Sequence, residues 1–127
     1  MRAICFIQEI KDADLTLRQQ QLICRRALRK LLWPCAWEWI AQAGTEERPV
    51  SLRPGMVELM RAAATGEAQV LVITDIEHLH CSEAELQGLL MALLQNGVHT
   101  FSANRGCWVE PGGRHWMTLP GYDGSEE

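Results

Sequence analysis

The chain has 127 residues, 47% of them hydrophobic and 22% charged, and a formal net charge of −4. This length suits one domain with a sizeable core, and the composition is that of an ordinary globular protein. The acidic balance argues against general attraction to nucleic acid but leaves room for a local basic patch. No apolar run approaches the ~20 residues that a membrane-spanning helix needs.

The five cysteines stand at positions 5, 24, 35, 81 and 107, without a CxxC pair. An odd number in this scatter does not form a disulfide framework. The start of the chain also lacks the charged and apolar regions of a secretory leader. We therefore expect free thiols and a reducing, cytoplasmic location.

Residues 2–10 (RAICFIQEI) are typical of a first strand, with positions 4 and 6 on one face. The turn at residues 12–14 is predicted to cap a helix that begins near Leu15. This helix carries an apolar stripe at positions 24, 27, 28 and 31. It should end at Trp33, because the residue before a proline avoids the helical region.

Residues 36–41 (AWEWIA) alternate as a second strand would, which places Trp37 and Trp39 on the same side. A loop follows at residues 42–52, of a length at which loops are usually functional or mobile. The segment from Arg53 onward then shows a much clearer pattern.

In residues 53–101, each expected helix begins and ends at residues that favour such a boundary. Pro54 suits the first turn of a helix, and Gly66 suits the left-handed residue that ends it. The apolar run VLVI at positions 70–73 is typical of a strand covered on both faces. Ser82 and Glu85 have capping-box spacing before a leucine-rich helix, which Gly97 closes ahead of a strand at 98–101.

A strand, a crossover helix and a second strand of this length predict a right-handed parallel unit. We therefore expect a single α/β domain with a mostly parallel sheet of four or five strands and helices on both faces. The domain is predicted to span residues 1–120, and the acidic, glycine-bearing residues 121–127 are predicted to be a disordered tail.

The pattern RPGM, a helix, GEAQVLVI, a short loop and LLxxLLxxGV resembles the catalytic domain of the serine recombinases, the resolvase and invertase family. The resemblance implies a resolvase-like fold. In that family a serine just after the first strand, in a YxRxS-like segment, attacks a DNA phosphate, and arginines stabilise the developing charge. Ile7 stands here where the family has that arginine, and Glu9 where it has the serine.

The family's second arginine-bearing segment, DRLxR-like, follows the third strand. Glu77 replaces its aspartate here, while His78 and Cys81 replace its two arginines. Arg53, in RPG, keeps its family identity. The resemblance therefore implies a degenerate domain that is not an enzyme and uses no cofactor. We expect an interaction or regulatory module in a bacterial DNA-processing or mobile-element system.

The C-terminal region carries a hairpin where the family has a long dimer helix and then a helix-turn-helix. Residues 107–109 and 115–117 flank a Pro-Gly-Gly turn. An edge strand with tryptophans suits a protein contact, so Trp108 and Trp116 are candidate anchors for self-association or another protein partner. The same tryptophans could equally be core residues. No small-molecule substrate is evident.

One alternative is a magnesium-dependent phosphoryl-transfer enzyme. Glu9 ends the first strand and Asp75 and Glu77 follow the third, so the three would converge at the carboxyl edge of a parallel sheet. This resembles the acidic magnesium site of Toprim domains. The lack of a glycine after Glu9 weighs against it. His78 and Cys81 have no partner at metal-ligand spacing, so we expect no metal there.

A second alternative is a nucleic-acid accessory protein that uses the basic first helix. Arg18, Arg25 and Arg29 would then contact phosphates. A solvated amphipathic helix explains the same charges, because cations near a helix C-terminus are favoured by the helix dipole.

Overall fold

The computed structural model describes residues 2–11, 14–112 and 116–118. Its helices and strands follow one another as β1 (Ala3–Gln8), α1 (Leu17–Leu31), β2 (Cys35–Ala41), α2 (Met56–Ala64), β3 (Val70–Ile73), α3 (Glu83–Gln95), β4 (His99–Ser102), β5 (Cys107–Val109) and β6 (Trp116–Thr118). Three short 3-10 turns join them, η1 (Thr45–Glu47), η2 (Val50–Leu52) and η3 (Ile76–Leu79). None of the described helices is long and apolar enough to span a membrane.

The strands form one sheet in the order β2-β1-β3-β4-β5-β6. The first four are parallel, and β5 pairs antiparallel with β4. These five make the mostly parallel sheet that the sequence predicts, and the three-residue β6 extends it at the edge by pairing antiparallel with β5. The α/β fold class and the C-terminal pair of strands are thus confirmed. The predicted tail at 121–127 and the last residue of the predicted Pro-Gly-Gly turn, Gly113, lie outside the described residues.

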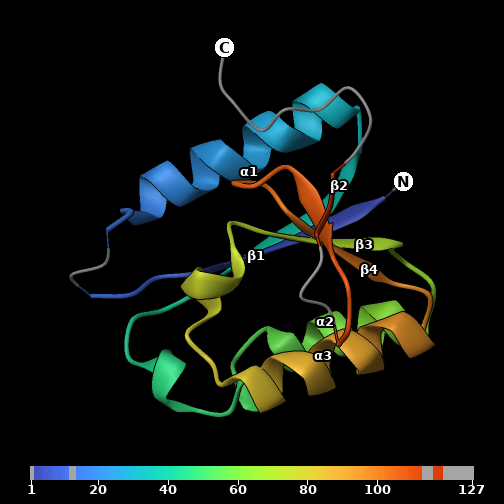
Figure 1. The fold of residues 1–127 in the computed structure, drawn as a ribbon. Helices are drawn as coiled ribbons and strands as arrows, with labels where there is room; N and C mark the ends of the chain where they lie inside the picture. Colours follow the sequence, from blue (N-terminus) through green and yellow to red (C-terminus); the bar gives the residue numbers. More distant parts are fainter. Residues whose placement is uncertain (1, 12–13, 113–115, 119–127) are drawn as a thin grey trace.

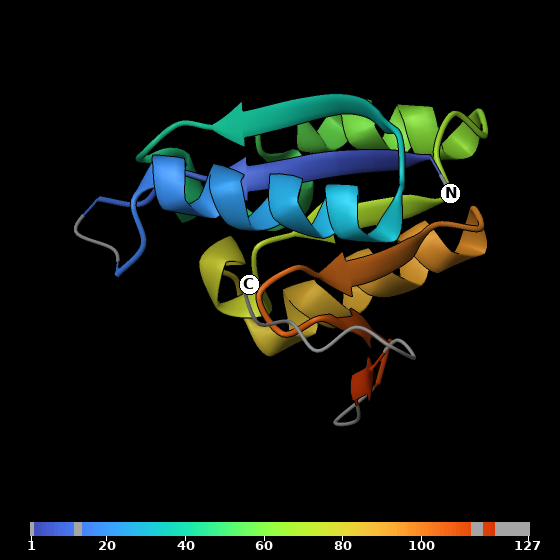
Figure 2. The ribbon, with the colours of Figure 1, turned by 90° about the horizontal axis from the view of Figure 1, so that it is seen from above.

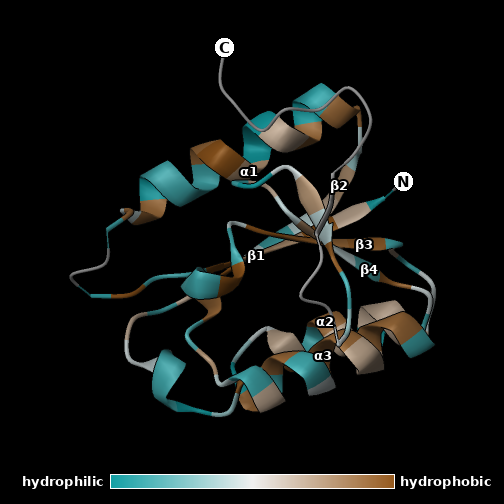
Figure 3. Ribbon diagram, in the orientation of Figure 1, coloured by the Kyte–Doolittle hydropathy of each residue, from teal (hydrophilic) through white to brown (hydrophobic). Residues whose placement is uncertain are grey.

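The three helices cover the sheet in two layers, with α1 on one face and α2 and α3 on the other (Figures 1 and 2). Alternate residues of β1 serve the two layers. Ala3, Cys5 and Ile7 join the core under α1, whereas Ile4 and Phe6 join the core under α2 and α3. Figure 3 shows that α1 is the most hydrophilic helix of the three, as a helix with one buried stripe and a solvated outer face should be.

The sequence predicted the cap of α3 correctly but not that of α1. The capping box of α3 is confirmed, with the Ser82 hydroxyl accepting from the Glu85 N–H at 3.1 Å. For α1 the helix begins at Leu17, two residues after the predicted start, but the predicted cap at residues 12–14 is wrong, because Thr16 and Gln19 form a reciprocal capping box. A hydroxyl and an amide satisfy two orphan N–H groups together, which fixes the start there.

Gly55 rather than Pro54 leads into α2, so the proline lies just before the first helical turn and not within it. Gly55 has φ +88°, and the Trp39 indole lies so close to its Cα that a Cβ would overlap the ring. Only glycine fits both the backbone angle and this contact. The result is a tight bend that turns the chain out of the 42–52 loop directly after Arg53.

Candidate functional site at the carboxyl edge of the sheet

Buried polar side chains gather where the parallel strands end. They are no more than 3% exposed and comprise Gln8, Gln20, Arg53, Thr74, Asp75 and Ser102. Gln8 ends β1, Thr74 and Asp75 follow β3, and Ser102 ends β4. In open α/β sheets this edge is where ligands bind. Because burying a polar group is costly unless it is hydrogen-bonded, the partners of each group decide what the site can do.

Arg53 is completely buried, yet it is not aimed at an open site. Its acceptors are the carbonyls of Glu46, Arg48, Leu79 and His80 and the side-chain oxygen of Gln8. A guanidinium has five N–H donors, so these five bonds use the whole group. The acceptors are uncharged, and burial accordingly lowers the pKa of Arg53. The arginine that the family resemblance retains is therefore a clamp between segments of this chain.

The segments that Arg53 joins are far apart in the sequence. Its Nη2 donates to Glu46 in η1 at 2.9 Å and to His80, just after η3, at 2.7 Å. The loop is also held from β1, because Gln8 Nε2 donates to the Gln42 carbonyl at 3.2 Å and to the Thr45 hydroxyl at 3.1 Å. The 42–52 loop is thus tied to the sheet by polar contacts, and no separate functional role is needed to explain its length.

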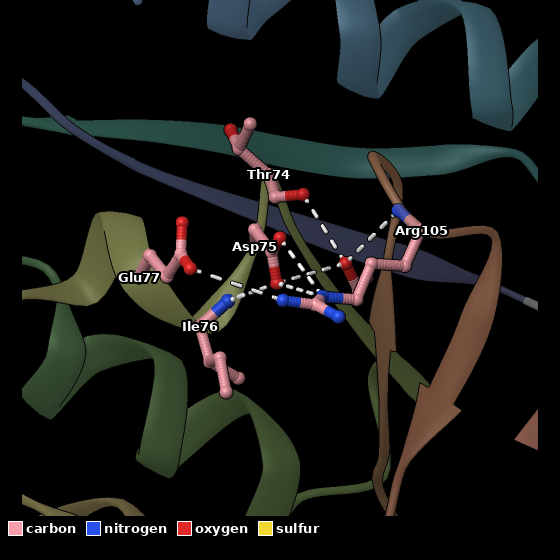
Figure 4. Close-up of polar contacts among 6 residues, drawn as sticks. Thr74, Asp75, Ile76, Glu77 and Arg105 are labelled. Atoms are coloured by element: carbon pink, nitrogen blue, oxygen red, sulfur yellow. Dashed lines mark hydrogen bonds and ion pairs between the residues drawn. The ribbon is translucent and has the colours of Figure 1, made fainter. Parts of the chain in front are cut away.

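Asp75 is the centre of a second polar cluster, shown in Figure 4. Both of its carboxylate oxygens lie 3.0 Å from Arg105 Nε. One oxygen also accepts from the Ile76 N–H at 2.7 Å and from the Ser102 hydroxyl at 3.4 Å. Glu77 contributes little, since its carboxylate is 3.9 Å from the Arg105 guanidinium and 73% exposed. The charge of Asp75 is therefore balanced within the protein.

A third set of contacts links α1 to the sheet. Gln20 Nε2 donates to the Gln8 carbonyl at 3.1 Å, and the Thr74 hydroxyl donates to Gln20 Oε1 at 3.4 Å. The Cys24 sulfur lies 3.6 Å from the same hydroxyl. Ser102 completes the chain, because its one hydroxyl proton is shared between the Thr74 carbonyl at 3.3 Å and the Asp75 carboxylate at 3.4 Å. Such a network orders a core when each of its members has a partner.

The positions that correspond to the family's catalytic residues are dispersed. Ile7 is 1% exposed and packs in the core under α1. Glu9 is partly exposed after β1, and Glu77 is exposed on η3. His78 and Cys81 are partly buried, and burial raises the pKa of Cys81. The structure brings Arg53 together with Gln8.

The three carboxylates of the magnesium hypothesis do not form a metal site. Glu9, Asp75 and Glu77 all belong to the described residues, and these contain no group of three or more His, Cys, Asp or Glu side chains that could hold a metal. The physical reason lies in Asp75, whose carboxylate is bound by Arg105. The parallel strands do end at one edge, as expected. The carboxylate of Asp75, however, binds the Arg105 guanidinium there instead of a magnesium ion.

The basic residues of α1 lie on its outer face. Arg18, Arg25 and Arg29 are exposed. Arg25 is already paired with Glu38 of β2 at 2.9 Å, and this glutamate removes part of the positive charge from that face. The solvated-helix interpretation accounts for these positions.

Trp108 lies within the protein's own aromatic cluster. Its ring centroid is 5.5 Å from that of Trp33 and 5.3 Å from that of Phe101, which is completely buried. His99 flanks it at 5.9 Å. These contacts partly bury Trp108, which packs against the core under α1. The side chain of Trp116 lies outside the described residues.

Sequence reasoning missed four residues of this edge: Gln20, Thr74, Ser102 and Arg105. Gln20 had a usable signal, because it lies four residues before Cys24 on the apolar stripe of α1, where a polar residue needs an explanation. Arg105 had none. Its pairing with Asp75 spans 30 positions of the sequence and depends on how β4 lies beside β3.

Comparison with protein-family models finds no match, and comparison with curated proteins finds none either. Solved structures do match. The N-terminal catalytic domain of TP901-1 integrase superposes with a TM-score of 0.74 at 11% identity, over 85% of this chain and 81% of that one. A resolvase family site-specific recombinase from Streptococcus pneumoniae gives 0.68 at 12% identity, over 85% and 75%.

A third structure agrees with these two. The C-terminal catalytic domain of ISC1926 TnpA, an IS607-like serine recombinase, gives a TM-score of 0.67 at 14% identity over 81% of this chain and 70% of that chain. At such identities the likeness shows the fold and not the chemistry. The chain has the fold of serine-recombinase catalytic domains.

Proposed function

We propose that this chain is a resolvase-like domain that does not cleave DNA and that acts as an interaction or regulatory module in a bacterial DNA-processing or mobile-element system. The observation that carries the proposal is the state of Arg53. Strand cleavage by this fold requires positive groups directed at the phosphate that reacts. The one arginine retained from the family pattern spends all five donors on oxygens of its own chain.

The nucleophile position supports the same conclusion. Glu9 stands where the resemblance places the serine, and a carboxylate there would repel a phosphate rather than attack it. Ile7, at the position of the family's first arginine, is apolar and buried in the core, so it offers no positive charge to a phosphate. Losing one donor that stabilises the transition state typically costs about 10²–10³ in rate.

The partner of such a module is proposed to be a protein, either a second copy or another component. The sheet ends at β2 on one side and at β6 on the other. Edge strands present backbone groups that another chain can pair with. Among the charged groups at the carboxyl edge, Asp75 and Arg105 neutralise each other. This edge is therefore poorly suited to a nucleic-acid backbone.

The test is a cleavage assay with supercoiled plasmid and with labelled duplex DNA, resolved on denaturing gels. We expect neither nicking nor a covalent protein–DNA adduct, and the Glu9→Ala variant should behave as the wild type does. An adduct formed by the wild type and absent from Glu9→Ala would show that the first strand carries chemistry after all, and the proposal would then fail.

A further inference from the structure

β2 forms one border of the sheet and runs along the outside of the ribbon in Figure 2. It has seven residues, more than any other described strand, and all but the last are exposed or only partly buried. Proteins usually protect such a border with a short strand or with a lysine or proline in it. The sequence CAWEWIA contains neither residue. This border is therefore open to pairing with another strand.

The unpaired main-chain groups of β2 belong to Glu38 and Ile40. The residues of a strand direct their N–H and C=O groups alternately to its two sides. The Ala41 carbonyl accepts from the Glu9 N–H at 2.8 Å, so Ala41 and, two residues earlier, Trp39 face β1. Glu38 and Ile40 consequently face the open border. In the described part of the chain, no backbone hydrogen bond outside the β1 ladder reaches these two residues.

The two faces of β2 carry different side chains. Trp37 and Trp39 pack on the side of α2 and α3, with their ring centroids 6.3 Å apart. Ile40 packs on the α1 side, and the Glu38 carboxylate accepts there from Arg25 of α1 at 2.9 Å. A strand that joins this border would thus meet tryptophans on one face and a neutralised carboxylate on the other.

A pocket of about 230 Å³ lies beside the end of β2. Its walls are formed by Trp39, Ile40, Ala41, Gln42, Thr45 and Pro54. The lining is mostly apolar, which suits an apolar or aromatic side chain better than a charged group. Strand addition commonly combines main-chain hydrogen bonds with such a pocket for one side chain of the added strand.

We propose that β2 pairs antiparallel with β2 of a second copy, about a two-fold axis at Trp39, and that Trp37 of each copy enters the pocket of the other. The proposal rests on the interaction role proposed above and names its partner. In this register the outward-facing groups of Glu38 bond to those of Ile40 in the copy. Trp37 lies opposite Ala41 of the copy, in a pair without hydrogen bonds, where side chains approach most closely.

The order of residues in β2 favours a second copy over an unrelated segment. The bulky Trp37 precedes the small Ala41 by four positions, so the two-fold axis places each tryptophan opposite an alanine and beside a pocket. A register centred on Glu38 would set two carboxylates opposite each other, which is unfavourable. The proposed register sets each Glu38 opposite Ile40 instead. Such an isologous contact closes on itself as a dimer.

The test is sedimentation equilibrium of the full chain over a range of concentrations, in which the wild type should dimerise. Glu38→Pro should raise the dissociation constant roughly tenfold or more, because it removes one outward N–H from each copy. Proline is tolerated on an edge strand where its N–H would face outward, and circular dichroism checks that the variant folds. The matched control Glu38→Ala removes the same carboxylate but keeps the N–H, and it should dimerise as the wild type does.

Two outcomes would overturn the dimer: a wild type that stays monomeric at millimolar concentration, or a folded Glu38→Pro variant that associates as tightly as Glu38→Ala. Neither outcome concerns DNA cleavage. The proposed lack of cleavage is decided by the gel assay alone, so the two proposals can fail separately.

Hydrogen exchange in the wild type requires no variant. The amides of Glu38 and Ile40 should exchange roughly tenfold more slowly at millimolar than at micromolar concentration, because only the dimer gives them acceptors. The Trp39 amide, which faces β1, should change little. Protection that appears in β6 (Trp116–Thr118) instead would place the contact at the other border of the sheet and would overturn the proposal for β2.

Discussion

Two arginines meet the same edge of the sheet in opposite ways. Arg53 is completely buried and bonded to neutral oxygens, whereas the Arg105 side chain is 42% exposed and bonded to the carboxylate of Asp75. Removing a buried group leaves its partners without hydrogen bonds, and the cost is that of desolvated polar atoms. Removing an exposed one lets water take its place. The two arginines should therefore matter to stability by very different amounts.

The two arginines also differ in whether a ligand could contact them. A cation with five internal acceptors is held in one place and cannot respond to a ligand. A cation at the surface, such as Arg105, can be contacted from outside, although Asp75 and Glu77 surround it with negative charge. The buried arginine thus stabilises the fold by joining Gln8 of β1, the 42–52 loop and the end of η3.

The largest effect is expected from Arg53→Met. Methionine fills part of the volume but leaves four backbone carbonyls and Gln8 without donors, so the free energy of unfolding should fall by ~3 kcal/mol or more. Urea unfolding followed by tryptophan fluorescence measures it. Arg53→Lys is the matched control, because it retains the charge but cannot match the fork geometry, and its loss should lie between those of wild type and Arg53→Met.

Protection of backbone amides provides a check that does not require the methionine variant to fold. Hydrogen exchange in Arg53→Lys should increase first in residues 45–48 and near His80, where the bonds to Arg53 are made. An increase spread evenly over the sheet would show that the arginine is not the local clamp described above.

The sequence predicted the βαβ framework because its signals are local. The Ser82–Glu85 capping box, the VLVI strand and the glycine after α3 each act within a few residues, and all three are confirmed. The predicted cap of α1 was wrong for a local reason too, since acidic residues at the preceding turn competed with Thr16 as possible caps.

The candidate site was harder to predict because its contacts are not local. The resemblance singles out Arg53, but whether its guanidinium faces a ligand or carbonyls depends on the loop folding back from residue 46 and on η3 approaching from residue 79. Asp75 was likewise placed correctly at the strand end. Its partner Arg105 follows a different strand, and no periodicity connects the two.

A smaller effect is expected from Asp75→Asn. The amide retains one oxygen but presents N–H donors to Arg105, and the arginine can regain water because it is partly exposed. The free energy of unfolding should fall by about 1–2 kcal/mol. Glu77→Gln is the control, since its carboxylate is 3.9 Å from Arg105 and exposed, and its stability should match wild type. A loss for Asp75→Asn as large as that for Arg53→Met would refute the contrast between the two arginines.

The smallest effect is expected on the outer face of α1, where the nucleic-acid alternative also has its test. Arg18, Arg25 and Arg29 are exposed, and Arg25 forms a surface pair with Glu38 of the kind that contributes little. Changing all three to alanine should leave the melting temperature within experimental scatter.

Binding to duplex DNA, measured by fluorescence anisotropy across a salt series, should be weak in wild type and hardly altered in the variant, because a net charge of −4 opposes association. If instead the wild type binds with a steep salt dependence and the triple variant loses it, this helix face is a phosphate-contacting surface. The interaction-module proposal would then have to give way to a nucleic-acid role.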